Sequence, residues 1–183
     1  MLYIMRHGKT AWNAVHKLQG KTDVPLNEEG RQMVEEAGKR YRDTHFDVCY
    51  CSPLIRARET AEAVLRGRDV PIITDARLEE MSFGVCEGSM DFMVNPENPI
   101  HDLFCAPEKY VTPPEGGESL QALYARTGEF LREVVEPGLR QGKDVLIVGH
   151  GAMNASIVCQ VRQMQLKDFW SAKMKNAELV RLI

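Results

Sequence analysis

Two stretches of the sequence have the same construction: LYIMRHG at residues 2–8 and VLIVGHG at residues 145–151. Each is an apolar run, typical of a buried strand, that ends directly in a His-Gly pair. In open α/β sheets, ligands bind beyond the carboxyl ends of the strands. Two such strands would therefore bring His7 and His150 to one edge of a sheet. The glycine after each histidine permits a tight turn and the close approach of a ligand.

The rest of the chain alternates between short β-type runs and helical patterns. The expected strands are at residues 2–5, 46–51, 70–74, 144–149 and 178–183. The expected helices lie within residues 26–44, 52–67 and 119–136, and a fourth starts just after residue 150. This alternation predicts an α/β fold: a three-layer α/β/α sandwich with a mainly parallel central sheet.

Residue types at the helix ends predict some of the boundaries. Asn27 can cap the first long helix by accepting from its free N–H groups. Ser52 is the expected cap of the second helix, with Pro53 at the first helical position. The third helix is expected to stop at Pro137.

Residues 84–118 interrupt the alternation. They contain five prolines and have no clean hydrophobic period. An irregular segment of this length in a compact domain is usually a functional lid or a binding loop. We therefore expect residues 1–183 to form a single domain with an irregular lid or insertion at about 84–118.

The composition is that of an ordinary globular protein, with 44% hydrophobic and 27% charged residues. A net charge of −3 without a Lys/Arg run gives no indication of nucleic-acid binding. The first apolar stretch ends at Arg6 and is too short for a signal peptide or a membrane span. We therefore expect a cytoplasmic protein with no membrane partner.

Five cysteines without C-x-x-C spacing are present: Cys49, Cys51, Cys86, Cys105 and Cys159. Zinc needs four ligands at a recognisable spacing, which these cysteines and the five histidines do not supply. We expect no metal site, and reduced thiols that pack as small apolar side chains.

The tripeptide at residues 8–10, Gly-Lys-Thr, resembles the end of a nucleotide-binding P-loop. A P-loop has the pattern G-x-x-x-x-G-K-[ST], whose first glycine lets backbone amides wrap the phosphates. Here that position is occupied by Tyr3, inside the apolar run. A P-loop NTPase is therefore the weakest of the functions considered.

Two arginines are expected at the same sheet edge as the histidines. Arg6 precedes His7, and Arg56 lies in the first turns of the helix that follows the strand at 46–51. Arginine binds phosphoryl oxygens bidentately, and the N-terminus of the helix after His150 also favours an anion. This set of residue types points to a phosphoryl group as the ligand.

The strand at 70–74 leads to Glu79 and Glu80, which bring carboxylic acids to the same region. A carboxylic acid is the group that would protonate a departing alkoxide oxygen. Taken singly, each of these residues except His7 is more simply explained as a structural or solvated side chain. Polar residues from four separate strand ends at one edge favour a catalytic site.

Six motifs in consecutive order make the sequence resemble the histidine phosphatase superfamily, also called the phosphoglycerate-mutase-like family. They are RHGKTAWN (6–13), LQGKTDVPLNEEG (18–30), SPLIRARETA (52–61), LEEMSFGVCEG (78–88), PPEGGES (113–119) and VGHG (148–151). RHG alone would be a weak signal, whereas the whole set covers nearly the entire chain and is specific.

The resemblance implies roles for ten residues. His7 would be the phosphorylated nucleophile and Glu80 the proton donor. Arg6, Arg56 and His150 would complete the phosphate pocket. Further contacts with the phosphate or the substrate would come from Asn13, Gln19, Gly20, Gly151 and Ala152.

The sequence departs from the family pattern at three places. Ser82 stands where many members have Asp, and HGAMN replaces the more usual His-Gly-Gly. Glu79 stands where a basic residue is frequent. None of these changes removes a catalytic group, but two adjacent glutamates leave open which carboxylate acts.

The resemblance implies a phosphomonoester hydrolase or a cofactor-dependent phosphoglycerate mutase. Such mutases are typically longer, with a basic insertion that holds a second acidic group. Residues 84–118 contain one lysine, Lys109, and no arginine. They offer instead an apolar surface of Phe92, Met93, Phe104 and Tyr110. We therefore favour a hydrolase that acts on a small phosphorylated metabolite through a phosphohistidine, with no metal or other cofactor.

A phosphate or phosphoprotein sensor without turnover is the alternative from another functional class. Binding alone requires neither a nucleophile such as His7 nor an acid such as Glu80, so the presence of both argues against it. The sequence does not rank the candidate substrates, and it leaves the oligomeric state open.

Overall fold

The computed structural model describes all 183 residues and contains one five-stranded sheet. The strand order is β3-β2-β4-β1-β5. The strands are β1 (Leu2–Arg6), β2 (Val48–Cys51), β3 (Ile72–Thr74), β4 (Val145–Gly149) and β5 (Leu179–Arg181). The first four are parallel to their neighbours, and β5 is antiparallel to β1. The prediction of a mainly parallel sheet is confirmed.

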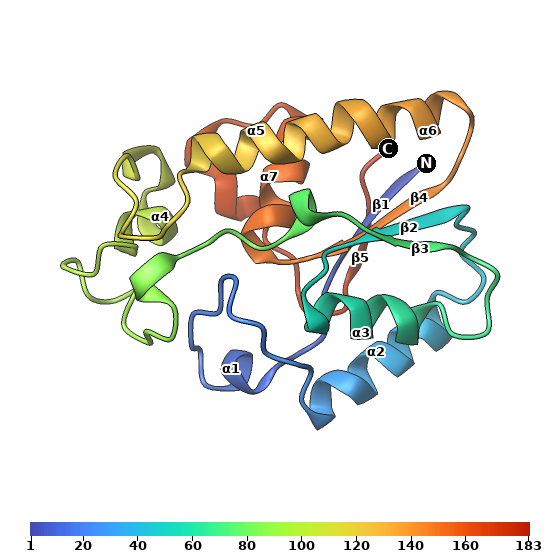
Figure 1. Cartoon of the computed structure of the whole chain (residues 1–183), viewed down its shortest axis with the longest axis horizontal. Helices are drawn as coiled ribbons and strands as arrows, with labels where there is room; N and C mark the ends of the chain where they lie inside the picture. Colours follow the sequence, from blue (N-terminus) through green and yellow to red (C-terminus); the bar gives the residue numbers. More distant parts are fainter.

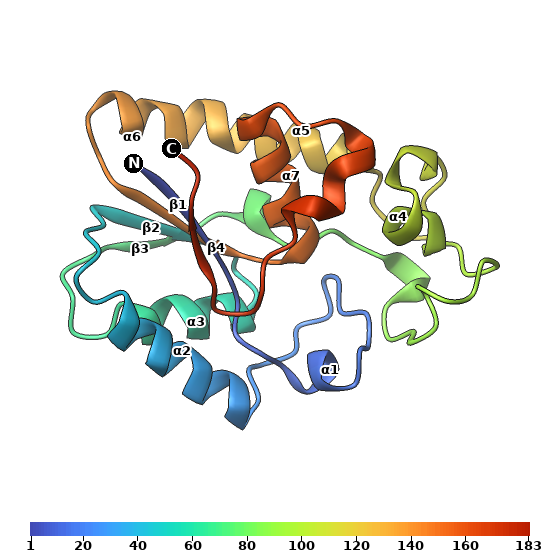
Figure 2. The ribbon, with the colours of Figure 1, turned by 180° about the vertical axis from the view of Figure 1, so that it is seen from behind.

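Helices cover both faces of this sheet (Figures 1 and 2). One face carries α2 (Glu28–Arg40) and α3 (Ile55–Val64), which pack against each other. The other face carries α5 (Leu120–Phe130), α6 (Glu136–Arg140) and α7 (Gly151–Arg162). The predicted three-layer α/β/α arrangement is therefore confirmed.

The core consists of two apolar clusters separated by the sheet, with 26 and 15 buried residues. Successive side chains of a strand point to opposite faces. Accordingly Leu2 and Ile4 of β1 belong to the larger cluster, and Tyr3 and Met5 to the smaller one. Parallel strands covered on both faces read as continuous apolar runs, which explains the apolar stretches of the sequence.

The predicted cap of α2 is present, whereas the predicted cap of α3 is wrong. Asn27 Oδ1 accepts a hydrogen bond from the N–H of Gly30 at 2.8 Å. The helix α3 begins at Ile55, two residues after Pro53, the expected first helical position. Its N-cap residue is Leu54, whose side chain makes no capping hydrogen bond. Ser52 Oγ instead accepts from the N–H of Leu54 and stabilises the turn before the helix.

The expectation that Pro137 ends the third helix is also wrong. The chain passes from α5 through a π-helical turn at Leu131–Val135 and continues as α6 to Arg140. Pro137 lies in the first turn of α6, where the missing N–H is tolerated. The wider π turn leaves room there for the proline ring. The general rule that a proline ends a helix does not take such a turn into account.

The segment at 84–118 is irregular apart from short helical turns. It contains α4 (His101–Cys105) and single 3₁₀ turns at Gly84–Cys86 and Pro107–Lys109. In Figures 1 and 2 it lies with α1 (Ala11–Ala14) on the side of the molecule away from the two termini. Its Leu103 side chain is fully buried in the larger apolar cluster.

Two expectations about individual side chains need correction. Tyr110 is 6% exposed and donates from its hydroxyl to Glu118 O, so it belongs to the core rather than to a substrate surface. Four of the five cysteines are buried, but Cys105 is exposed.

No helix of the structure combines the length and the apolar character that crossing a membrane requires.

Candidate active site

Neighbouring strand ends place the two histidines together. Arg6, the last residue of β1, is level with Gly149 of β4 in the parallel register, so His7 and His150 follow on adjacent strands. Their ring centroids are 5.2 Å apart. His7 is 2% exposed and lines a cavity, whereas His150 is fully buried beside it and does not reach the cavity wall.

The hydrogen bonding of His7 determines its tautomer. Its Nδ1 lies 2.6 Å from the carbonyl oxygen of Gly8, and because a carbonyl only accepts, Nδ1 must carry the proton. Burial, and then the positive charges of Arg56 and Arg6, lower the pKa of His7 well below its ordinary value. The ring is therefore neutral, and the lone pair of Nε2 is free on a residue that faces the cavity.

His150 is neutral for the same reasons. Burial, followed by the positive charge of Arg56, lowers its pKa well below the ordinary value. Neither ring nitrogen has a hydrogen-bond partner within the protein. The positive charge around the two rings is therefore carried by the arginines.

Arg56 is a buried guanidinium without a carboxylate partner. It is 1% exposed, and its Nη2 and Nη1 donate to the carbonyls of Gly20 at 2.6 Å and Thr22 at 2.9 Å. Its Nε is buried and makes no hydrogen bond. Buried charges are normally paired, and Arg56 lines the cavity, where an anion would supply the missing partner.

Arg6 is held in a comparable way. Its Nη1 donates to the carbonyl of Met174 at 3.0 Å, and its Nε is also buried without a partner. Burial lowers the pKa of Arg6, and the nearby Glu80 partly opposes this shift. Two desolvated guanidinium groups therefore lie in the cavity lining together with His7.

Of the two adjacent glutamates, Glu80 alone lines the cavity. Its Oε1 accepts from the N–H groups of Met81 at 2.8 Å and Met153 at 2.9 Å, and its Oε2 from that of Ala152 at 3.1 Å. The side chain of Glu79 instead pairs with Lys21 Nζ at 2.8 Å. Of the two carboxylates, only that of Glu80 is therefore positioned at the cavity.

The N-terminus of α7 is shared between this carboxylate and the cavity. Ala152, expected to contact the phosphate, gives its N–H to Glu80, although the residue also lines the cavity. Gly151 lines the cavity as well, and as the first residue of α7 its N–H has no acceptor within the helix. One free amide of this helix end therefore remains for an anion.

The remaining predicted contacts come from the segment after β1. Asn13 Oδ1 accepts from Thr10 N at 3.1 Å, which leaves its NH₂ group without a protein partner in the cavity wall. Gln19 Oε1 accepts from Thr10 Oγ1 at 2.8 Å. Gly20 has a φ of +59° and lines the cavity. All ten predicted residues except His150 thus contribute to one cavity wall, and His150 lies directly behind it.

The cavity has a volume of about 520 Å³ and a mixed rim. Its apolar rim residues are Phe83, Met90, Phe92, Met93, Phe104 and Trp170, and its basic ones are Lys9, His16, Lys17 and Lys173. Phe104 stacks on Trp170 with the ring centroids 5.0 Å apart and the planes inclined by 11°. The cavity lining therefore combines the guanidinium groups of Arg6 and Arg56 with aromatic and Met side chains.

The model of the histidine phosphatase superfamily (branch 1) matches residues 2–183. The chain belongs to this superfamily.

Relatives of this histidine phosphatase include both mutases and phosphatases by name. It is 32% identical to a 2,3-bisphosphoglycerate-dependent phosphoglycerate mutase of Cytophaga hutchinsonii, over 92% of this chain and 80% of that protein. It is 30% identical to phosphoserine phosphatase 1 of Hydrogenobacter thermophilus, over 96% and 82%. The solved structure of Bacillus stearothermophilus YhfR aligns with a TM-score of 0.86 at 34% identity, covering 97% of this chain and 88% of that one.

Sequence reasoning missed several site residues of this superfamily member. Trp170, Lys173 and Asn176 come from the irregular segment after α7, which carries no motif. Asn176 Nδ2 donates to the carbonyl of His7 at 2.8 Å and so holds the backbone at His7. No group of three or more His, Cys, Asp or Glu side chains is arranged to hold a metal ion.

Glu87 is a further missed residue, although it stands inside a motif. Its carboxylate accepts from the N–H groups of Lys21 at 3.0 Å and Thr22 at 2.9 Å. The loop at 20–22 is therefore held between Glu87 on one side and Arg56 on the other. The available signal was its position in the motif at 78–88, because a glutamate there can accept hydrogen bonds from the backbone N–H groups of a binding loop.

Proposed function

We propose that this chain is a phosphomonoester hydrolase that acts on a small phosphorylated metabolite through a phosphohistidine at His7. The observation that carries the proposal is the floor of the cavity. There a neutral His7 with a free Nε2 lies beside two buried guanidinium groups, those of Arg6 and Arg56, that lack a carboxylate partner.

In the first step, Nε2 of His7 attacks the phosphorus atom in line with the ester oxygen. A P–N bond forms and the P–O bond breaks, while Glu80 gives its proton to the leaving oxygen. Arg6, Arg56, the Asn13 amide and the N–H of Gly151 neutralise the equatorial oxygens, which is where most of the catalysis of phosphoryl transfer lies.

In the second step, a water oxygen attacks the phosphorus of the phosphohistidine. The P–N bond breaks, Glu80 takes the proton of the water, and inorganic phosphate leaves with His7 restored. His150 lies behind His7, with the ring centroids 5.2 Å apart, and keeps one N–H in either neutral tautomer. The negative charge of a phosphoryl group bound at His7 would raise the pKa of His150 and favour its protonated form.

A phosphoglycerate mutase is the second candidate, and the cationic part of the rim favours it. Lys17 lies over the ring of Trp12 with its Nζ 4.5 Å from the centroid, and neither Lys17 nor Lys173 forms an ion pair with a carboxylate. These lysines would suit a substrate that carries a second acidic group. Against a mutase, the excursion at 84–118 contributes aromatic and Met side chains, and no arginine, to the rim.

Two assays decide between the candidates. Turnover of para-nitrophenyl phosphate with a chelator present supports a hydrolase and removes the non-catalytic sensor from consideration. Rapid conversion of 3-phosphoglycerate to 2-phosphoglycerate with catalytic 2,3-bisphosphoglycerate would instead support the mutase. If the rim lysines bind a second acidic group, Lys17→Met and Lys173→Met raise KM for carboxylate-bearing phosphates and leave KM for para-nitrophenyl phosphate nearly unchanged.

We also propose a reducing compartment, the cytoplasm, as the location. All five cysteines are free thiols, and Cys105 is exposed, which suits a compartment that keeps thiols reduced. Cell fractionation followed by immunoblotting tests this placement.

A further inference from the structure

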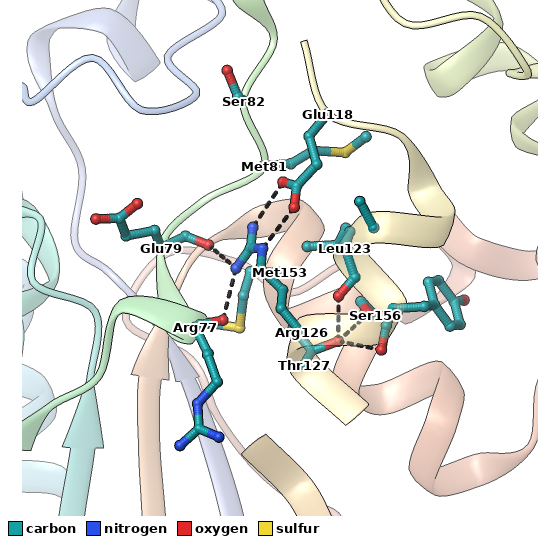
Figure 3. Close-up of polar contacts among 12 residues, drawn as sticks. Arg77, Glu79, Met81, Ser82, Glu118, Leu123, Arg126, Thr127, Met153 and Ser156 are labelled. Atoms are coloured by element: carbon teal, nitrogen blue, oxygen red, sulfur yellow. Dashed lines mark hydrogen bonds and ion pairs between the residues drawn. The ribbon is translucent and has the colours of Figure 1, made fainter. Parts of the chain in front are cut away.

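Arg126 of α5 makes four hydrogen bonds outside the cavity, to groups on two other segments (Figure 3). Its Nε and Nη2 donate to the two carboxylate oxygens of Glu118 at 2.7 and 2.9 Å. Its Nη1 donates to the carbonyl of Arg77 at 2.7 Å and to that of Glu79 at 2.8 Å. The guanidinium thus uses four of its five N–H donors, two on Glu118 and two on backbone carbonyls.

The carbonyl contacts bear directly on Glu80. The carbonyl of Glu79 belongs to the peptide unit that joins Glu79 to Glu80, so holding it fixes the plane from which the Glu80 side chain departs. The carbonyl of Arg77 anchors the same segment two residues earlier. Arg126 therefore sets the backbone position of Glu80 without touching the cavity.

The carboxylate of Glu80 is held by α7, which is in turn joined to α5, the helix that carries Arg126. Its oxygens accept from Ala152 and Met153 at the N-terminus of α7. Next to Arg126, Thr127 Oγ1 lies 2.7 Å from Ser156 Oγ and joins α5 to α7 (Figure 3). Both ends of the Glu80 side chain are consequently held by a unit made of α5 and α7.

Glu118, the ion-pair partner of Arg126, also holds the residues that follow Glu80 in the sequence; we call this ion pair and its backbone contacts the Arg126–Glu118 clamp. Its N–H donates to the carbonyl of Ser82 at 2.8 Å, and Ser82 Oγ donates to the carbonyl of Gly116 at 2.8 Å. The side chains of Arg126 and Glu118 are 18% and 15% exposed, so the ion pair is largely shielded from solvent. The segment on each side of Glu80 is thereby tied to one ion pair.

We infer that Arg126 is a positioning residue for the proton donor, and that Glu118 orients it. This inference rests on the proposed function, in which Glu80 protonates the leaving oxygen. General acid catalysis requires the donor within hydrogen-bond reach of the oxygen it protonates, and a displacement of about 1 Å caused from outside the site can cost about 10²-fold in rate.

The test measures kcat/KM for a series of phosphate esters whose leaving oxygen becomes progressively more basic: para-nitrophenyl, phenyl and ethyl phosphate. This parameter reports the steps up to formation of the phosphohistidine. A nitrophenolate leaves without a proton, whereas an alkoxide needs one, so loss of the acid is felt most by ethyl phosphate. A general loss of folding or binding would lower all three values equally.

We expect Arg126→Met to lower kcat/KM about threefold for para-nitrophenyl phosphate and about 10²-fold for ethyl phosphate. Arg126→Lys keeps the charge but not the fork, and we expect the same trend. Arg132→Met is the matched control, since Arg132 is an exposed arginine further along the same stretch of helix, and it should leave the series unchanged. Equal losses in Arg126→Met, or full recovery in Arg126→Lys, would overturn the inference.

Two further variants keep the outcome decisive. If Arg126→Met does not fold, Glu118→Ala frees the guanidinium while keeping its charge, and a uniform series in that variant also overturns the inference. Glu80→Gln tests the underlying function. A steeper series in Glu80→Gln with an unchanged one in Arg126→Met refutes only the inference, whereas an unchanged series in Glu80→Gln refutes Glu80 as the donor as well.

Discussion

The imidazole rings of His7 and His150 lie 5.2 Å apart at the ends of two neighbouring parallel strands. The parallel pairing of β1 with β4 brings together residues that are 143 positions apart in the chain. The same sheet edge receives Arg56 from the helix after β2 and Glu80 from the segment after β3. The proposed chemistry depends on this convergence.

The buried guanidinium of Arg56 should be essential for activity. Arg56→Met removes a desolvated donor aimed at the phosphoryl group, and we expect kcat/KM for para-nitrophenyl phosphate to fall by at least about 10²-fold. Arg58→Met is the matched control, because Arg58 is exposed on the same helix two residues further on. Equal activity of the two variants would show that Arg56 has no part in binding the phosphate.

The two adjacent glutamates should behave differently. Glu80→Gln leaves an amide that cannot deliver a proton, and we expect the rate of ethyl phosphate hydrolysis to fall by about 10²-fold or more. Glu79→Gln only weakens a partly exposed pair with Lys21 and should change the rate by less than about twofold. The assignment of Glu80 is wrong if Glu79→Gln has the larger effect.

Stability should fall in mild acid because two histidines are buried in the neutral form. The pKa of His7 and of His150 lies well below the ordinary value in the folded protein, so the unfolded chain binds more protons at acidic pH. Their contribution is fully present above about pH 6.5 and is lost as the pH falls from there toward the folded-state pKa.

Within that window each ring should contribute a slope of about 1.4 kcal/mol per pH unit to the free energy of unfolding. Urea unfolding at several pH values measures the slope. In His150→Asn one of the two rings is absent, and the slope should fall by about half. A variant that keeps the full slope would show that His150 is not held neutral by the fold.

Gly20 should be more sensitive to substitution than its backbone conformation alone requires. Gly20 and Gly67 both have positive φ, but a Cβ on Gly20 would lie 2.1 Å from Glu87 Oε1, while one on Gly67 meets nothing within 4 Å. Gly67→Ala measures the conformational cost, about 1–2 kcal/mol. We expect Gly20→Ala to cost about 1–3 kcal/mol more in urea unfolding, and to raise KM. Equal costs would mean that Glu87 moves freely.

Local patterns were sufficient for the parts of the site that depend on single elements. An apolar run that ends in His-Gly predicts both a buried strand and a polar residue at its carboxyl end, as found for His7 and His150. The cap at Asn27 depends on one side chain and one nearby N–H, and it is also correct. Information of this kind lies within a few residues of sequence.

Features that arise from contacts between distant segments were not predictable in this way. Pro137 is accepted inside a helical stretch because a π turn precedes it, and Lys173 reaches the cavity from a segment without periodicity. The Arg126–Glu118 clamp joins α5 to the end of the irregular segment at 84–118. Each of these depends on which segments the sheet and its helices bring side by side.

Detection of the phosphoenzyme tests the central claim most directly. The enzyme is mixed with a phosphate ester labelled with ³²P, quenched in base within milliseconds, and digested for peptide mapping. We expect an acid-labile, base-stable label on the peptide that contains His7, and no label and no turnover in His7→Ala. His45→Ala, which replaces an exposed histidine, should label normally. Label on another residue, or undiminished turnover in His7→Ala, would contradict the account.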